Sequence, residues 1–162
     1  GTPKVGTTLT AQPGTWLEGE TFTYQWFVNN IAVPGATNSS YKPTNSDAGK
    51  SVKVAVTGAK TGFLNLTVSS ASATITGGTL TAVTPKITGT LKVGKVLTAT
   101  TGTWPQGPKF TFVWKRGAVI VSKTSTYKLT KLDLGKTLTL TVTATKTGFN
   151  TVTKSVVSLK VK

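Results

Sequence analysis

One set of aromatic, glycine and lysine motifs occurs twice in this chain, and this internal repeat constrains the possible folds most. Each motif returns 86 to 88 positions later. The matching pairs are Gly14-Thr15-Trp16 with Gly102-Thr103-Trp104, Phe22 to Trp26 with Phe110 to Trp114, Asp47 to Lys50 with Asp133 to Lys136, and Lys60 to Phe63 with Lys146 to Phe149. A period of this length is too long for a solenoid and suits tandem globular domains. We therefore expect two similar domains, residues 1–76 and 85–162, joined by a linker at 77–84.

Apolar and polar residues alternate with a period of two through most of the chain. Leu138, Leu140 and Val142, for example, alternate with threonines. No long stretch has the spacing of an amphipathic helix. Short alternating segments between Gly, Pro and Asn residues predict an all-β fold with two antiparallel β-sandwich domains. In the second domain the predicted strands span residues 86–88, 95–101, 109–116, 118–122, 125–130, 136–146 and 154–161.

The first domain lacks a short segment that the second domain has. Gly1-Thr2 aligns with Gly89-Thr90, so no residue of the first domain matches Pro85 to Thr88. From this alignment we expect the chain to be a fragment of a longer protein, cut inside a repeat.

Charge is divided unevenly between the two domains. The whole chain has 19 Lys and Arg residues against four Asp and Glu residues, a net charge of +15. Residues 1–84 contain five lysines and three acidic residues, a net of +2, whereas residues 85–162 contain 14 basic residues and the single acid Asp133, a net of +13. Similar domains with such different charge are expected to meet different partners. No apolar stretch is long enough to span a membrane.

The amino-acid inventory excludes the commonest catalytic sites. Without His or Cys, the chain can form neither a Ser-His-Asp triad nor an imidazole or thiolate metal site. The second domain has one carboxylate and so cannot supply the acid pair of a glycosidase. We predict a chain that is not an enzyme and has no cofactor or metal. Asp47 and Asp133 are expected to accept backbone N–H bonds at a turn, with Gly49 and Gly135 in an unusual backbone conformation.

The four tryptophans fall into two pairs. Trp26 and Trp114 lie in mid-strand on the apolar face, so we expect them to pack between the two sheets. Trp16 and Trp104 end a strand beside a loop, where both core packing and stacking on a sugar ring fit the sequence. Trp16 and Trp104 are therefore the candidate sugar-stacking residues.

The order of these motifs resembles the Ig-like repeats of secreted and surface-attached actinobacterial proteins. The matching stretches are Lys4 to Ala11, Gly14 to Trp16, Phe22 to Trp26, Tyr41 to Thr57 and Lys60 to Phe63, and in the second copy Lys92 to Ala99, Gly102 to Trp104, Phe110 to Trp114, Tyr127 to Thr143 and Lys146 to Phe149. The resemblance implies two tandem Ig-like domains that act as a non-catalytic spacer or accessory region of a secreted or cell-surface bacterial protein with further domains. Ser122-Lys123 replaces the Pro-Gly-Ala turn of the first copy, so we expect a different shape along that edge.

The basic second domain supports a hypothesis about binding. Its lysines on predicted outer faces, edges and loops are Lys109, Lys115, Lys123, Lys128, Lys131, Lys154, Lys160 and Lys162, and Arg116 is a further candidate for binding an anionic surface. Such a field attracts polyanions, for which teichoic acids, acidic wall polysaccharides and extracellular DNA are the candidates. Because lysine predominates over arginine, the pattern favours diffuse attraction over sequence-specific nucleic-acid recognition.

Two alternatives stay open at this point. In the first, the lysines only keep a threonine-rich strand protein soluble and its sheet edges unpaired. In the second, the chain is a carbohydrate-binding module that accompanies a secreted polysaccharide-degrading enzyme and uses Trp16 or Trp104.

Overall fold

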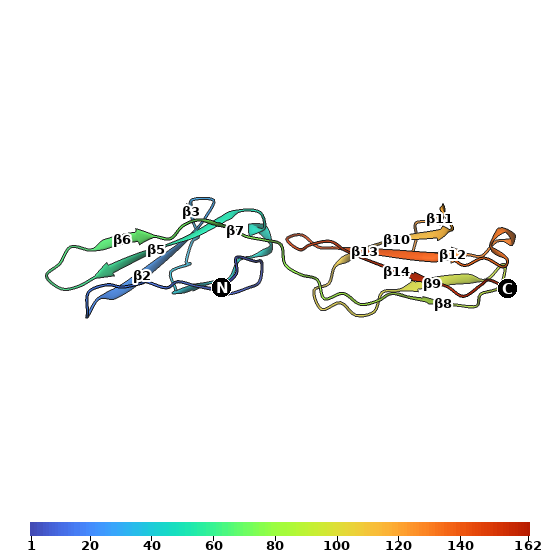
Figure 1. Cartoon of the computed structure of the whole chain (residues 1–162), viewed down its shortest axis with the longest axis horizontal. Coiled ribbons are helices and arrows are strands. Elements are labelled where there is room, and N and C mark those ends of the chain that lie inside the picture. The colour runs from blue at the N-terminus through green and yellow to red at the C-terminus, as the bar shows by residue number, and fades with distance from the viewer. The chain divides into compact units, whose positions relative to one another are not determined.

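The computed structural model describes all residues 1–162 and divides into two compact units. The first unit contains residues 1–78 and 147–149, and the second contains residues 79–146 and 150–162. Antiparallel strands are the main regular secondary structure of each unit (Figure 1), which confirms the predicted all-β class. The structure contains no helix with the length and hydrophobicity required to cross a membrane.

The first unit is a sandwich of a larger and a smaller sheet. The larger sheet has the strand order β3-β2-β5-β6, with β7 also pairing with β5, and the smaller sheet pairs β1 with β4. The strands are β1 (Leu9–Thr10), β2 (Thr21–Val28), β3 (Ile31–Ala32), β4 (Ser40–Tyr41), β5 (Ser51–Ala59), β6 (Leu66–Ser69) and β7 (Ala73–Thr74), with the short 3-10 helix η1 (Asn45–Asp47) before β5.

The second unit has the same arrangement with one more strand in its smaller sheet. Its larger sheet has the order β11-β10-β13-β14, and its smaller sheet the order β12-β9-β8. The strands are β8 (Lys86–Thr88), β9 (Val96–Thr100), β10 (Lys109–Arg116), β11 (Val119–Ser122), β12 (Thr126–Lys128), β13 (Thr139–Thr145) and β14 (Val152–Val157), with η2 (Lys131–Asp133) before β13.

Each unit has its own core around one tryptophan. Trp26 pairs with Val54 across β2 and β5, and Trp114 pairs with Leu140 across β10 and β13. Both indoles are buried, and each indole N–H donates to a backbone carbonyl, that of Asn38 or Thr124, at 3.0 Å. A buried indole needs such a partner because its N–H would otherwise lose a hydrogen bond to water. The predicted core positions of Trp26 and Trp114 are confirmed.

The two units differ along the edge that follows the first long strand. In the first unit Asn29 and Asn30 both have positive φ and form a tight turn into the two-residue strand β3. In the second unit β11 has four residues, and the register shifts between Trp114 and Lys115. The different shape predicted from Ser122-Lys123 is therefore present.

The last strand of the second unit differs from its predicted range. The alternation in the sequence predicts a strand at 154–161, but β14 spans Val152–Val157. It ends there because the hydroxyl of Ser158 accepts the N–H of Leu138 at 2.9 Å, where a backbone carbonyl would continue the ladder. Leu138 itself lies before β13, which shortens the strand predicted at 136–146 to Thr139–Thr145.

Candidate functional site

Asp133, the single acidic residue of the second unit, is completely buried. Its carboxylate accepts hydrogen bonds from the backbone N–H of Thr130 at 2.7 Å, the Thr130 hydroxyl at 2.8 Å, the Tyr127 hydroxyl at 2.9 Å and Nη1 of Arg116 at 2.8 Å. Burial raises the pKa of Asp133, but these donors outweigh burial and hold the pKa below its usual value. The predicted turn role of Asp133 is confirmed, and Gly135 has φ of +70°.

Asp47 forms the corresponding network in the first unit. Its carboxylate accepts from the backbone N–H and hydroxyl of Thr44 at 2.7 and 2.8 Å and from the Tyr41 hydroxyl at 2.9 Å. Burial, followed by the hydrogen bond to Asp47, raises the pKa of Tyr41 to about 12. Val28 stands at the end of β2, where the second unit has Arg116 at the end of β10. Asp47 therefore has no arginine partner.

Arg116 is a correction to the set of surface cations predicted from the sequence. Its side chain is only 21% exposed, and its guanidinium forms an ion pair with the buried Asp133. Because the one carboxylate side chain of the unit is used in this way, no acidic side chain of the second unit reaches the surface to neutralise the lysines.

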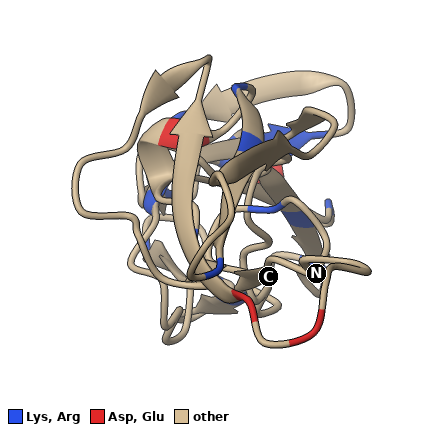
Figure 2. Ribbon diagram, turned by 90° about the vertical axis from the view of Figure 1, so that its left-hand side faces the viewer, with Lys and Arg blue, Asp and Glu red and all other residues tan.

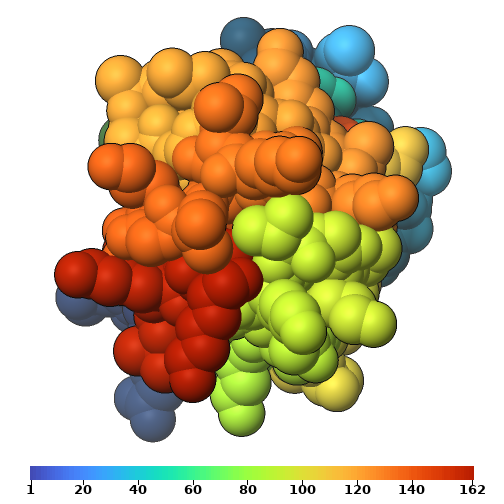
Figure 3. All heavy atoms as spheres, turned by 90° about the vertical axis from the view of Figure 1, so that its right-hand side faces the viewer, coloured from blue at the N-terminus to red at the C-terminus, as the bar shows by residue number.

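Lysines gather at one end of the second unit. Three segments that are distant in the sequence meet there through backbone hydrogen bonds, which join Lys162 to Leu91, Gly94 to Leu129, and Val161 to Lys136. Figure 3 shows this end, with the C-terminal residues in red beside the green segment that follows β8. We call its six exposed lysines the basic end: Lys92, Lys95, Lys131, Lys136, Lys160 and Lys162.

The same end of the first unit carries far less charge. Equivalent backbone hydrogen bonds join Thr76 to Pro3 and Ile75 to Lys50, which fixes the correspondence of positions. The residues equivalent to the basic end are Lys4, Thr7, Asn45, Lys50, Thr74 and Thr76. Two lysines therefore stand where the second unit has six. Figure 2 shows how few acidic residues the chain has among its basic ones.

The sequence hypothesis included Lys131, Lys160 and Lys162 of the basic end and missed Lys92, Lys95 and Lys136. Lys92 and Lys95 lie in the loop between β8 and β9, Lys136 follows η2, and Lys162 follows β14. Their proximity depends on the last residues of the unit running beside the loop after its first strand. The recurrence of a Lys-Val-Gly motif at Lys4 and Lys92 was the available signal, since it marks this loop in both units.

The structure distributes the remaining predicted lysines over the second unit. Lys109 and Lys115 lie on the outer face of β10, because alternate residues of that strand, Phe110 to Trp114, point into the core. Lys128 extends from the outer face of β12, opposite Val96, and Lys123 from the turn before it. Lys154 is exposed in the edge strand β14.

The two candidate sugar-stacking tryptophans are held inside their units to different extents. Trp104 is only 8% exposed, its indole N–H donates to the carbonyl of Thr101 at 2.9 Å, and Phe110 packs edge-on to it at 5.5 Å. Stacking needs an open ring face, and this burial leaves Trp104 none.

Trp16 is half-buried and packs edge-on to Phe22 at 5.4 Å. It borders an open cavity of about 220 Å³ with Leu66 and Val68. The sugar-stacking hypothesis therefore depends on Trp16 alone.

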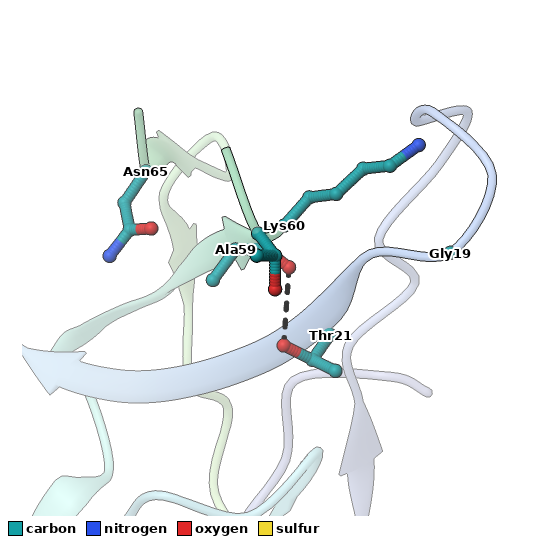
Figure 4. Close-up of a pocket in the computed structure, with 6 residues that line it drawn as sticks. Gly19, Thr21, Ala59, Lys60 and Asn65 are labelled. Carbon is teal, nitrogen blue, oxygen red and sulfur yellow. Dashed lines mark hydrogen bonds between the residues drawn. The ribbon is translucent and has the colours of Figure 1, made fainter. Parts of the chain in front are cut away.

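A second, polar cavity of about 330 Å³ opens at one end of the first unit (Figure 4). Gly19, Thr21, Ala59, Lys60 and Asn65 are among its lining residues. The Thr21 hydroxyl donates to the carbonyl of Ala59 at 3.2 Å, and the Lys60 ammonium extends away to the carbonyl of Glu18 at 2.7 Å. Thr21 and Lys60 therefore bond to backbone carbonyls of the protein itself and do not converge on the cavity as ligand-binding groups would.

The acidic side chains of the structure do not form a metal site. Nowhere do three His, Cys, Asp or Glu side chains come close enough together to hold an ion. Asp47 and Asp133 are each buried within a network of donors from their own unit, so neither is available as a general acid or base.

Comparison with known proteins finds a curated relative that is much longer than this chain. No protein-family model matches the chain. A highly immunogenic outer capsid protein of Enterobacteria phage T4 is 31% identical over 154 residues, which cover 90% of this chain. The aligned region spans 40% of the length of that capsid protein.

Among solved structures, two with Ig-like or adhesin descriptions align along almost the whole chain. The amphioxus IgVJ-C2 molecule covers 95% of this chain and 97% of its own, with a TM-score of 0.39 and 15% identity. A Ca²⁺-stabilized adhesin that helps an Antarctic bacterium reach out and bind ice covers 94% of this chain and 42% of its own, with a TM-score of 0.41 and 17% identity.

Proposed function

We propose that this chain is a non-catalytic, surface-displayed Ig-like region of a larger protein, and that the basic end of its second unit attaches it to an anionic polymer. The similarity to an outer capsid protein supports display on the outside of a particle or cell. The two strand sandwiches support an accessory role beside other domains.

The observation that carries the binding proposal is the basic end. Six lysines project from segments that backbone hydrogen bonds hold together, and the one acidic side chain of the unit is buried against Arg116. Unneutralised cations on one surface raise the local concentration of a polyanion and speed its association.

The chemistry of the basic end favours a flexible, repeating anion over a shaped ligand. A lysine ammonium is a hydrated point charge on a mobile stem and does not impose the two-pronged geometry of arginine. Teichoic acids and acidic wall polysaccharides present such repeating charges. The proposal therefore places the protein at a cell surface or wall, in agreement with the resemblance to surface-attached proteins.

Binding of the full chain to immobilised wall teichoic acid, with heparin as a second linear polyanion, tests this proposal. We expect retention at about 0.01 M salt, where the Debye length is about 30 Å, and release at about 1 M, where it is about 3 Å. No retention of the folded chain at low salt on either polymer would overturn the proposal.

The two units supply a matched control for the same experiment. The double variant Lys92→Gln with Lys136→Gln removes two charges from the basic end and should weaken binding several-fold. Lys4→Gln with Lys50→Gln alters the equivalent positions of the first unit and should change binding little. Equal losses from the two double variants would show that net charge, and not the basic end, determines binding.

A further inference from the structure

The edge strand of the larger sheet, β6 in the first unit and β14 in the second, differs in charge between the units. Val68 of β6 pairs with Val56, and Lys154 of β14 pairs with Val142, so Val68 and Lys154 occupy the same place in the two sheets. Both side chains are exposed. The second unit therefore has a lysine in its edge strand where the first unit has a valine.

The backbone of β6 has unpaired groups on its outer side. The N–H of Ser70, directly after β6, donates to the carbonyl of Val54 at 2.9 Å. Because backbone groups alternate along an antiparallel strand, Thr67 and Ser69 direct their N–H and C=O groups away from β5. In the second unit β8 joins the smaller sheet and leaves β14 at the edge, so an open edge at this place is a property of the fold.

The β6 edge lacks the devices that prevent edge strands from pairing. Charged residues, prolines and covering segments usually give this protection. The sequence from Thr61 to Gly78 contains no charged residue and no proline. Within β6 itself, Leu66 is 59% exposed and Val68 is 49% exposed. Lys154 protects the edge of β14, and the edge of β6 is left able to pair with another strand.

The segment 65–69 is symmetrical in polarity about its central residue, Thr67. Leu66 and Val68 flank Thr67, and the polar residues Asn65 and Ser69 flank these in turn. Two such strands can pair antiparallel about a two-fold axis through Thr67. Leu66 of each copy then faces Val68 of the other, and Asn65 faces Ser69. Every side chain meets one of like polarity, which is the arrangement that stabilises cross-strand pairs.

We propose that the β6 edge pairs with the β6 edge of a second copy of this chain, antiparallel about Thr67, to form one continuous sheet. The outward N–H and C=O groups of Thr67 and Ser69 supply the main-chain hydrogen bonds, as in other cases of strand addition. Such a short pairing buries little surface, so the association is weak and reversible. It uses the first unit and is independent of the polymer binding proposed for the basic end.

Sedimentation equilibrium and amide hydrogen exchange by NMR, both on the full chain over a range of concentrations, test this proposal. We expect a monomer–dimer equilibrium. The amides of Thr67 and Ser69 should exchange at least about tenfold more slowly where the dimer predominates, since hydrogen-bonded strand amides are protected.

Salt should strengthen the dimer, whereas it weakens polymer binding. Two chains with a net charge of +15 repel each other. Raising the salt from about 0.1 M to about 1 M shortens the Debye length from about 10 Å to about 3 Å and screens this repulsion. A dimer that dissociates at high salt would contradict pairing through an uncharged edge.

Reciprocal variants identify the strand that pairs. Val68→Lys gives β6 the residue that β14 has at the same place and should abolish association. Lys154→Val gives β14 an unprotected edge and should produce species larger than a dimer. Lys109→Val removes the same charge from the outer face of β10, which is not an edge strand, and should leave the dimer unchanged.

Three further results would overturn the proposal. The first is a chain that stays monomeric at every concentration. The second is a dimer that persists in Val68→Lys. The third is protection of Thr67 and Ser69 that does not depend on concentration, because another part of the same chain would then cover the edge. The measurements on the unaltered chain decide the question even if Val68→Lys does not fold.

Discussion

At the scale of single residues, the buried aspartates are the features on which each unit depends most. Both carboxylates fasten the turn before a central strand to a tyrosine and a threonine, but only Asp133 also binds an arginine. A buried carboxylate is stable only when hydrogen bonds replace the water it has lost. Asp133 and Arg116 therefore form a coupled pair in which each stabilises the burial of the other.

Asp133→Asn should destabilise the second unit more than Asp47→Asn destabilises the first. Removing one partner of a buried ion pair leaves the other charge uncompensated, which costs about 3–5 kcal/mol. Loss of hydrogen bonds without a stranded cation costs about 1–3 kcal/mol, which is the value expected for Asp47→Asn. Differential scanning calorimetry of the two variants measures the difference, and equal shifts in the two variants would contradict the role assigned to Arg116.

The pH dependence of the same proteins provides a second readout. Folding lowers the pKa of both aspartates from 3.8, so each contributes its full stability above about pH 4 and loses it as the pH falls towards the folded-state pKa. Native stability should therefore decline below about pH 4, and each Asn variant should show a weaker decline.

At the scale of strands, the closeness of β5 to the loop that contains Trp16 distinguishes the two units. Gly58 of β5 pairs with Phe22, and Ala144 of β13 pairs with Phe110. A Cβ atom on Gly58 would lie 2.7 Å from Cζ3 of Trp16 and 2.9 Å from Oε2 of Glu20. The Trp16 indole of the first unit therefore packs directly against the backbone of Gly58, whereas the equivalent position of the second unit carries the methyl group of Ala144.

Gly58→Ala should push Trp16 outwards. The added methyl group overpacks the contact, at a cost of about 1–3 kcal/mol. The hydrogen bond of 2.7 Å from the Trp16 indole N–H to Pro13 should weaken, and NMR should show faster exchange of that proton. Ala144→Gly, the reciprocal change, should leave the Trp104 indole proton protected. An unchanged exchange rate of the Trp16 indole proton in Gly58→Ala would show that the loop moves to accommodate the methyl group without loss of this hydrogen bond.

Strand prediction from the sequence succeeded where alternation alone determines the structure. The range predicted at 109–116 equals β10, because Phe110, Phe112 and Trp114 define one apolar face without ambiguity. Prediction was wrong at the end of β14, since the strand stops where the Ser158 hydroxyl takes a bond that the backbone would have made. Because this bond comes from Leu138, which is distant in the sequence, the end of the strand has no local signature.

Sequence reasoning also had limits at the candidate site. It identified the high positive charge of the second unit. It did not predict that the lysines gather at one end of the unit, or that Arg116 forms an ion pair with the buried Asp133. Both depend on contacts between distant segments, such as that between Lys162 and Leu91. The net charge of a unit can be counted from the sequence, whereas the positions of those charges in space depend on the topology of the fold.

At the scale of the whole molecule, the two units share one scaffold and differ in surface charge. The shared part consists of the paired central strands, the core tryptophans and the aspartate turns. The different part is a set of lysines placed on positions that the scaffold does not need. The two units therefore offer a polyanion similar surfaces of different electrostatic potential. The relative affinity of the polyanion for these surfaces shows where the attraction is strongest.

Lysines at the basic end should contribute more to polyanion binding than lysines on a sheet face of the same unit. Lys131→Gln with Lys160→Gln removes two charges from loops that converge, and Lys109→Gln with Lys115→Gln removes two from the outer face of β10. Each cation that contacts a polyanion adds about one to the slope of log affinity against log salt. Heparin affinity measured over a series of salt concentrations should show the slope falling by about two in the first variant and little in the second. If both slopes fall equally, the polymer samples the whole basic surface, and the basic end would have no special role.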